Sequence, residues 1–269
     1  MEIAADLSDR DLEVLGSIGS ERFLTTGQLT RLHFSDKPTK TAATRSANRT
    51  LAKLKSLRLI DALERRIGGV RAGSASYVWG LAPAGGRLLH LTGTLPERSK
   101  WVREYEPSRH YLEHTLALAE VRMRLREAER RGDFTILELV REPDCWRPYN
   151  APGGGVARIK PDLALVTASG EFEDHWFIEI DLATERPARV LRTCLAYEEY
   201  RRTGLEQKRA GVFPVVVWVV PNRRRKEAVL DRLAEDSRIS SGLFQVVLFD
   251  EFERLIKDGA PWLETGHES

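Results

Sequence analysis

Cysteine and methionine are scarce in this sequence, with two of each among 269 residues. Cys145 and Cys194 lack the short spacings that are typical of zinc sites, so we expect two free thiols in a reducing compartment. No apolar run approaches the 18 residues that a membrane-spanning helix needs. The acidic start MEIAADLSDRDLEVL is unlike a secretory signal, and the sequence therefore predicts a cytoplasmic protein without membrane contact.

Several catalytic and nucleotide-binding motifs are missing as well. The sequence has no HExxH or GxSxG motif, and the glycine-rich segment 151–158 lacks the Lys-Ser/Thr pair of a phosphate-binding loop. His110 and His114 are four residues apart, a spacing that can hold a metal on a helix. Without the rest of a metal motif they fit a solvated or capping role better.

The net charge of +2 hides an uneven distribution of charge. Between Ser35 and Ala75 ten basic residues face three acidic ones, so this segment carries +7 and the rest of the chain carries −5. A charged run is usually a solvated face, so the place of these residues in the fold decides what they do.

The N-terminal segment predicts three helices. Ser8 and Asp11 have the spacing of a capping box at the start of the first helix, and TTGQLTRLHF (25–34) predicts the second. A longer third helix is expected from Lys40 to Leu57. Its apolar stripe consists of Ala43, Ala47, Leu51 and Leu54.

Two strand-like runs, 59–65 and 74–81, follow the helices and flank a basic, glycine-rich loop that is typical of a hairpin tip. Three helices and a hairpin in this order predict an α+β winged helix-turn-helix domain, in which the third helix enters the major groove of DNA and the hairpin touches the backbone. Short polar side chains between arginines suit base edges and phosphates. The expected DNA-binding residues are Lys40, Thr44, Arg45, Asn48, Arg49 and Lys53 on the helix and Arg65, Arg66 and Arg71 in the hairpin. The alternative is a winged helix that contacts protein and has a solvated basic face.

The rest of the chain predicts a second domain of α/β type with a central mixed sheet. An amphipathic helix begins near His110 and ends at Gly132, and an unbroken apolar run at 212–220 indicates a strand buried on both faces. We expect a winged-helix domain at 1–95, a connection at 96–106, the second domain at 107–257 and a C-terminal tail at 258–269.

Three acidic residues stand in two otherwise apolar runs of this second domain. Asp162 lies in IKPDLALV (159–166), and Glu179 and Asp181 lie in DHWFIEIDL (174–182). Strand alternation would put Lys160 and Asp162 on one face, and Glu179 and Asp181 on one face. Three converging carboxylates could hold Mg²⁺. The other reading is that Asp162 and Asp181 cap strand ends or pair with Arg158 or Arg186, without a metal.

The order of elements resembles the restriction-endonuclease-like fold, whose motif is Pro-Asp on one strand and acid-x-Lys on the next. Pro161-Asp162 and Glu179 match this motif, but Asp181 occupies the lysine position. The resemblance implies that the acids hold Mg²⁺, that Lys160 stands in for the lysine, and that Glu113 or Glu120 supplies a further acid. Because the lysine is lost, we expect a catalytically inactive site, with no cofactor or with bound Mg²⁺ only.

The whole chain, from Leu7 to Ile256, resembles the replication-relaxation family of actinobacterial plasmids and integrated mobile elements. The segments that carry this resemblance are LSDRDLEVLGSI (7–18), RLIDALER (58–65), YVWGLAPAG (77–85), EHTLALAEV (113–121) and the pair PDLALV (161–166) and FIEIDLATE (177–185). The resemblance implies a role in plasmid DNA relaxation or replication through DNA binding. It implies no catalytic residue.

These observations predict a DNA-binding protein of a plasmid or mobile element that acts in replication, DNA relaxation or its regulation. Its expected partners are double-stranded DNA, a second copy of the chain, and replication or mobilisation proteins. The second domain is expected to serve dimerisation or partner contact, or to bind DNA without cutting it. One alternative is a Mg²⁺-dependent DNA nuclease or nickase that uses Asp162, Glu179, Asp181 and Lys160. Another is a transcription regulator whose second domain senses a ligand.

Overall fold

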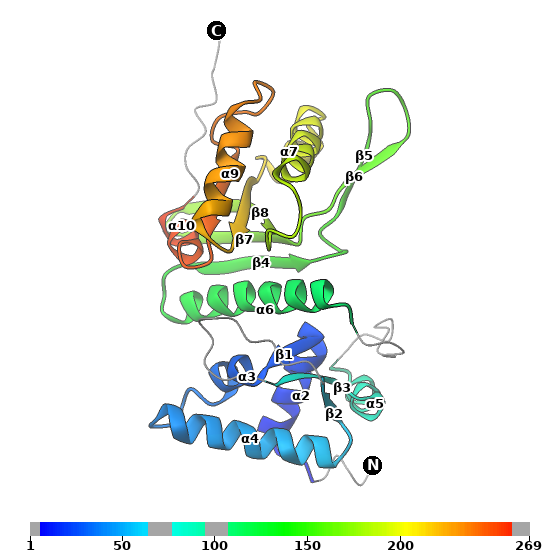
Figure 1. Ribbon diagram of the computed structural model, residues 1–269, viewed down its shortest axis with the longest axis vertical. Helices are drawn as coiled ribbons and strands as arrows, with labels where there is room; N and C mark the ends of the chain where they lie inside the picture. Colours follow the sequence, from blue (N-terminus) through cyan, green and yellow to red (C-terminus); the bar gives the residue numbers. More distant parts are fainter. Residues whose placement is uncertain (1–5, 64–76, 95–106, 260–269) are drawn as a thin grey trace. The chain divides into compact units, whose positions relative to one another are not determined.

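The computed structural model describes residues 6–63, 77–94 and 107–259 (Figure 1). The chain is a mixed α+β protein that forms two compact units, Met1–Met123 and Arg124–Ser269. The division falls within helix α6 (Arg109–Arg130), so each unit contains part of this helix. The predicted connection at 96–106 lies wholly outside the described residues, as does most of the predicted tail at 258–269.

The first unit combines helices with a small antiparallel sheet, in which β3 lies between β1 and β2. Its elements before α6 are α2 (Asp9–Glu21), β1 (Phe23–Thr25), α3 (Thr26–His33), α4 (Lys40–Ser56), β2 (Ile60–Ala62), β3 (Val78–Leu81) and α5 (Pro83–Leu91). The three predicted helices are confirmed. The predicted hairpin is represented by β2 and β3, whose connection lies outside the described residues.

Local capping explains where the first two helices begin. At α2 the Ser8 side chain accepts a hydrogen bond from Asp11 N, and the Asp11 carboxylate accepts one from Ser8 N at 3.0 Å. Thr25 and Gln28 form the same reciprocal arrangement at α3. Each box satisfies backbone N–H groups that have no partner within the helix, so it fixes the first turn.

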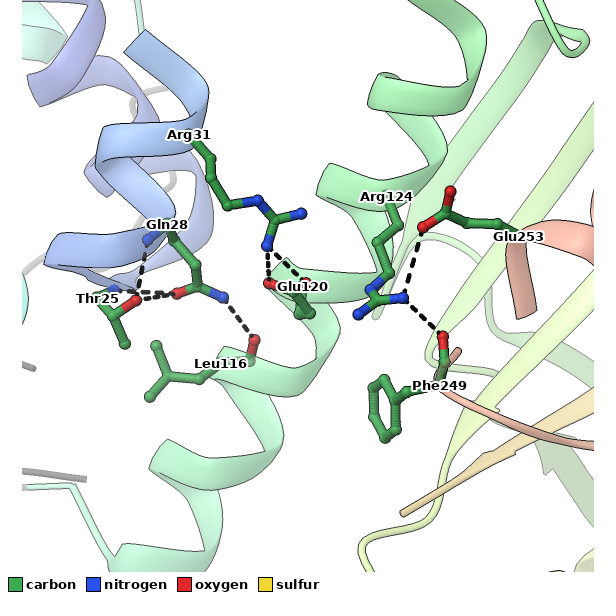
Figure 2. Close-up of polar contacts among 8 residues, drawn as sticks. All are labelled: Thr25, Gln28, Arg31, Leu116, Glu120, Arg124, Phe249 and Glu253. Carbon is green, nitrogen blue, oxygen red and sulfur yellow. Dashed lines mark hydrogen bonds and ion pairs between the residues drawn. The ribbon is translucent and has the colours of Figure 1, made fainter. Parts of the chain in front are cut away.

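The first part of α6 belongs to the core of the first unit. Leu112 and Leu116 are buried in a cluster with Phe23 of β1 and Val78 of the neighbouring strand β3. Gln28 also donates a hydrogen bond from Nε2 to the Leu116 carbonyl at 3.1 Å (Figure 2). The helix that the sequence assigns to the second domain therefore supplies apolar side chains to the first unit.

A second polar contact holds α6 against α3 in the same unit. Arg31 forms an ion pair with Glu120, with Nη1 lying 2.7 Å from Oε1 (Figure 2). This pair is partly exposed, so it contributes less than the apolar cluster beneath it.

The second unit is built on a five-stranded mixed sheet with the order β10-β9-β8-β7-β4. Strand β7 is antiparallel to both of its neighbours, β4 and β8, whereas β8, β9 and β10 run parallel to one another. The strands are β4 (Thr135–Arg141), β7 (Leu163–Ser169), β8 (Phe172–Ile180), β9 (Val215–Val220) and β10 (Phe244–Leu248). All six residues of β9 are buried, as its unbroken apolar run predicts.

The proline- and glycine-rich insertion after β4 forms a separate two-stranded hairpin, β5 (Arg147–Asn150) with β6 (Val156–Ile159). Gly153, Gly154 and Gly155 all have positive φ at its tip, a conformation that favours glycine. The glycine-rich segment 151–158 thus contains the tip of a hairpin whose two strands the sequence did not predict.

Helices connect the parallel strands. The connection from β8 to β9 contains α7 (Pro187–Arg202) and α8 (Leu205–Ala210), and α9 (Arg223–Ala234) connects β9 to β10. Helices α7 and α9 pack against each other and lie on the same side of the sheet (Figure 1). Helix α10 (Phe252–Asp258) follows β10. Each parallel strand is thus followed by a helix that starts at the carboxyl edge of the sheet.

Two contacts hold the last part of α6 within the second unit. Arg124 donates a hydrogen bond from Nη1 to the Phe249 carbonyl at 2.9 Å and lies 3.5 Å from Glu253 (Figure 2). Leu125 and Ala128 of the same helix are buried. Among the described residues, no helix combines the length and the apolarity that crossing a bilayer requires.

Candidate functional site

Helix α4 has two faces with different chemistry. Ala43, Ala47, Leu51 and Leu54 are buried, which confirms the predicted stripe. All six DNA-binding residues predicted on this helix are exposed: Lys40, Thr44, Arg45, Asn48, Arg49 and Lys53. This face therefore offers cations and short polar groups to solvent along more than two helical turns.

The polar residues of this face make few contacts with the rest of the unit. The Thr44 hydroxyl donates to the Lys40 carbonyl at 2.9 Å, and Arg49 donates from Nη2 to the Ser46 hydroxyl at 3.3 Å. Both contacts stay within the helix. The two side chains can therefore exchange them for an external partner without disturbing the core.

Lys53 differs from the other predicted residues because it is engaged in the fold. Its ammonium group lies 2.7 Å from Asp11 Oδ2 and 2.7 Å from the Asp6 carbonyl. Burial raises the pKa of Asp11, but the hydrogen bonds from Lys53 and Ser8 outweigh this effect and hold the pKa below 3.8. Lys53 thus stabilises the start of α2. The predicted hairpin residues Arg65, Arg66 and Arg71 lie outside the described residues.

The structure brings Asp162 and Glu179 together. Asp162 precedes β7 and Glu179 lies near the end of β8, and both side chains are buried. Asp162 Oδ2 accepts a hydrogen bond from Ile180 N at 2.7 Å, and Glu179 Oε1 accepts one from the Tyr197 hydroxyl at 2.6 Å. Asp162 is therefore held by the backbone of the strand that carries Glu179.

The electrostatics of this pair favour an uncharged Glu179. Burial raises its pKa well above 4.5, and the negative charge of Asp162 raises it further, whereas the hydrogen bond from Tyr197 lowers it. The same surroundings raise the pKa of Tyr197. Nearby, burial raises the pKa of the Cys145 thiol to about 12, and this thiol donates to the Pro161 carbonyl. Proton-bearing groups thus surround the pair.

Asp181 is directed to a different partner. Arg225 of α9 donates from Nε to Asp181 Oδ2 at 2.6 Å, and Ala183 N donates to Oδ1 at 2.9 Å. The two side chains are each only 7% exposed. The predicted partners Arg158 and Arg186 are therefore wrong for Asp181, because Arg225 compensates its charge. Among the described residues, no group of three or more His, Cys, Asp or Glu side chains is placed to hold a metal ion.

The residues proposed to complete a nuclease-like site lie elsewhere. Lys160 is exposed between β6 and β7, where strand alternation does not apply, and its ammonium group lies 4.8 Å from the centroid of the Trp146 ring. Such cation–π contact accounts for its position. Glu113 pairs with Arg109 at 2.8 Å, and Glu120 pairs with Arg31.

Sequence reasoning missed two residues of this region, Tyr197 and Arg225. Tyr197 is one of the fully buried side chains of α7, and Arg225 is the buried member of a basic run at the start of α9. The only signal in the sequence was a helix beginning with three arginines, which is unusual because helix N-termini favour acidic residues.

The second unit also contains a cavity of about 220 Å³ beside α8. Arg147, Arg209 and the buried Glu206 line it, and both arginines form ion pairs with Glu206, at 3.1 and 3.0 Å. The cavity is smaller than most small-molecule sites. The charged groups of the cavity wall already compensate one another through these ion pairs. They therefore give little support to a ligand-sensing role.

The fold and these groups define a two-unit α+β protein with an exposed basic helix in one unit and a neutralised acidic cluster in the other. The sequence model of the replication-relaxation family matches residues 15–216. The chain belongs to the replication-relaxation family, as its sequence predicted. This membership suggests a role in plasmid replication or relaxation. A comparison with curated proteins gave no match.

Proposed function

We propose that this protein binds double-stranded DNA through the exposed face of α4 and acts in the replication or relaxation of a plasmid or mobile element. The observation that supports this proposal most directly is the position of Arg45 and Arg49. Both are exposed beside Thr44 and Asn48, on the face of α4 opposite its buried stripe. Arginine and short amide or hydroxyl side chains are the groups that read base edges and phosphates.

The order of elements in the first unit supports a winged helix-turn-helix reading. Three helices precede β2 and β3, and α4 is the third of them. In this class of domain the third helix enters the major groove. Figure 1 shows α4 well separated from α6, so the first part of α6 leaves the exposed face of α4 uncovered.

The test compares duplex binding by the full chain and by Arg45→Ala/Arg49→Ala. We expect a loss of roughly 1–3 kcal/mol for each arginine that contacts a base. The matched control is Arg232→Ala/Arg238→Ala, which removes the same charge from exposed ion pairs of the second unit. An equal loss of affinity in both double variants would show that α4 has no special role.

For the second unit we propose a role in dimerisation or partner contact rather than DNA cleavage. The neutralisation of Asp181 by Arg225 and the raised pKa of Glu179 both remove negative charge that a divalent cation would need. A homodimer fits because one recognition helix reads few base pairs and specific sites commonly pair two. Sedimentation of the protein with and without DNA tests the dimer, and a monomer under both conditions would contradict it.

A further inference from the structure

The carboxyl edge of the parallel strands in the second unit has an unusual charge distribution. Helices α7 and α9 begin there, directly after β8 and β9, and they pack side by side (Figure 1). Their first turns contain no acidic residue. The backbone N–H groups and the dipole make such ends electropositive, so acidic residues are the usual choice.

Basic residues, rather than acidic ones, stand at the starts of these two helices. Helix α9 starts with Arg223, Arg224, Arg225 and Lys226, and Arg186 stands at the N-cap of α7 without making a side-chain cap. Arg186, Arg223 and Arg224 are exposed. Cations at a helix N-terminus are unfavourable in the protein alone, which indicates that an anion compensates them.

Three carboxylates near this edge each have a partner of their own. Glu185 pairs with Arg189 at 2.5 Å, and Glu251 pairs with Lys226 at 2.5 Å. The hydrogen bonds from Leu248 N and Lys226 lower the pKa of Glu251, and the charge of Arg223 adds a smaller effect. Asp181 is neutralised by Arg225. The edge therefore keeps an excess of positive charge at its exposed arginines.

A buried orphan donor provides an independent indication. Arg225 is 7% exposed, and its Nη2 atom has no hydrogen-bond partner among the described residues. The Nε atom of Arg225 is bound to Asp181, the residue that follows β8 and begins the loop to α7. The backbone N of Asp181 donates a hydrogen bond to the Val219 carbonyl. The guanidinium in the first turn of α9 is thus held beside the residue that follows β8. An unpaired buried guanidinium nitrogen is costly, so this donor is suited to an acceptor that arrives with a ligand.

We propose that this edge binds phosphate groups of the DNA backbone through Arg223, Arg224 and the first turns of α7 and α9. Guanidinium groups and helix N-termini are the common donors for phosphate oxygens. Because the exposed cations extend over two helices, the edge fits several successive phosphates better than a single small anion. The choice of DNA rests on the proposed function, and the contact is independent of base sequence.

The test measures duplex binding by the full chain at several salt concentrations. In Arg223→Ala/Arg224→Ala we expect the slope of log K against log salt to fall by about 1.8, and affinity near 0.15 M salt to fall roughly 10- to 30-fold for all sequences alike. Both arginines are exposed and stand at a helix N-terminus, so the melting midpoint should not fall and should rise slightly when they are removed. Arg232→Ala/Arg238→Ala, at and beyond the other end of α9, is the matched control and should keep the wild-type slope.

The outcomes separate this inference from the role of α4. A loss in Arg223→Ala/Arg224→Ala without a loss in Arg45→Ala/Arg49→Ala supports the phosphate-binding edge and contradicts the proposed reader helix. An unchanged slope in Arg223→Ala/Arg224→Ala overturns the edge and leaves the α4 proposal to its own test. If millimolar inorganic phosphate raises the melting midpoint through these arginines while the DNA slope is unchanged, the edge binds a small anion and the DNA inference is wrong.

Discussion

Arg225 and Asp181 form a buried ion pair in which Nε lies 2.6 Å from Oδ2, although 44 residues separate them in the sequence. The pair occupies the position at which the nuclease-like pattern has a lysine. Its geometry connects the end of β8 to the first turn of α9. It therefore joins the sheet to a helix through two buried charged groups.

Removing one partner of this pair should be strongly destabilising. Asp181→Ala leaves the Arg225 charge buried without compensation, and we expect the free energy of unfolding to fall by about 3–5 kcal/mol in urea titrations. Glu235→Ala is the control, since it breaks an exposed pair with Arg232 and should change stability by about 0.5 kcal/mol or less. Equal effects of the two substitutions would mean that the buried pair has no special role.

The same geometry predicts no metal-dependent cleavage. Supercoiled plasmid incubated with the protein and Mg²⁺ or Mn²⁺ should remain uncut, because Asp181 is already paired and because burial and the charge of Asp162 raise the pKa of Glu179. Asp181→Lys should restore no activity, since it places a second cation beside Arg225. Nicking by the wild type that Asp162→Ala abolishes would instead establish the nuclease alternative.

Lys53 should affect stability in a manner that depends on pH. The pKa of Asp11 is lowered in the folded state, so its contribution to stability is present above pH 3.8 and is lost as the pH falls through the folded-state pKa. Lys53→Met should lower the free energy of unfolding by about 1 kcal/mol at pH 7, because Lys53 is partly exposed. The difference from the wild type should shrink toward zero near pH 2. A difference that stays constant with pH would show that Lys53 acts through packing alone.

Gly85 should tolerate no side chain, although it lies inside a helix. A Cβ atom at this position would lie 2.1 Å from the Leu59 carbonyl oxygen, so α5 and the segment before β2 would have to separate. We expect Gly85→Ala to lower the melting temperature by several degrees, with a cost of about 1–3 kcal/mol. Gly27→Ala in α3 meets only Thr25 Oγ1 at 3.8 Å and should be neutral or stabilising. Similar melting temperatures for the two variants would contradict the close approach at Gly85.

Local signals made much of the fold predictable. The capping residues Ser8 and Asp11 and the apolar stripe of α4 depend on residues a few positions apart, and both are observed. The sequence could not reveal that Arg225 would neutralise Asp181, because that pairing depends on how α9 packs beside β8. Alternation also failed for Lys160, since it lies between β6 and β7 rather than in a strand. Pairings between distant segments were thus the part that local patterns could not supply.

The packing of α6 determines which residues a fragment of the first unit must contain to keep its core intact. A fragment that ends at the predicted boundary, residue 95, would lose Leu112 and Leu116 and uncover Phe23 and Val78. It would also leave Gln28 Nε2 without the Leu116 carbonyl. A chimeric protein that includes this unit should therefore retain the chain through Met123, because the first turns of α6 cover apolar side chains of the unit.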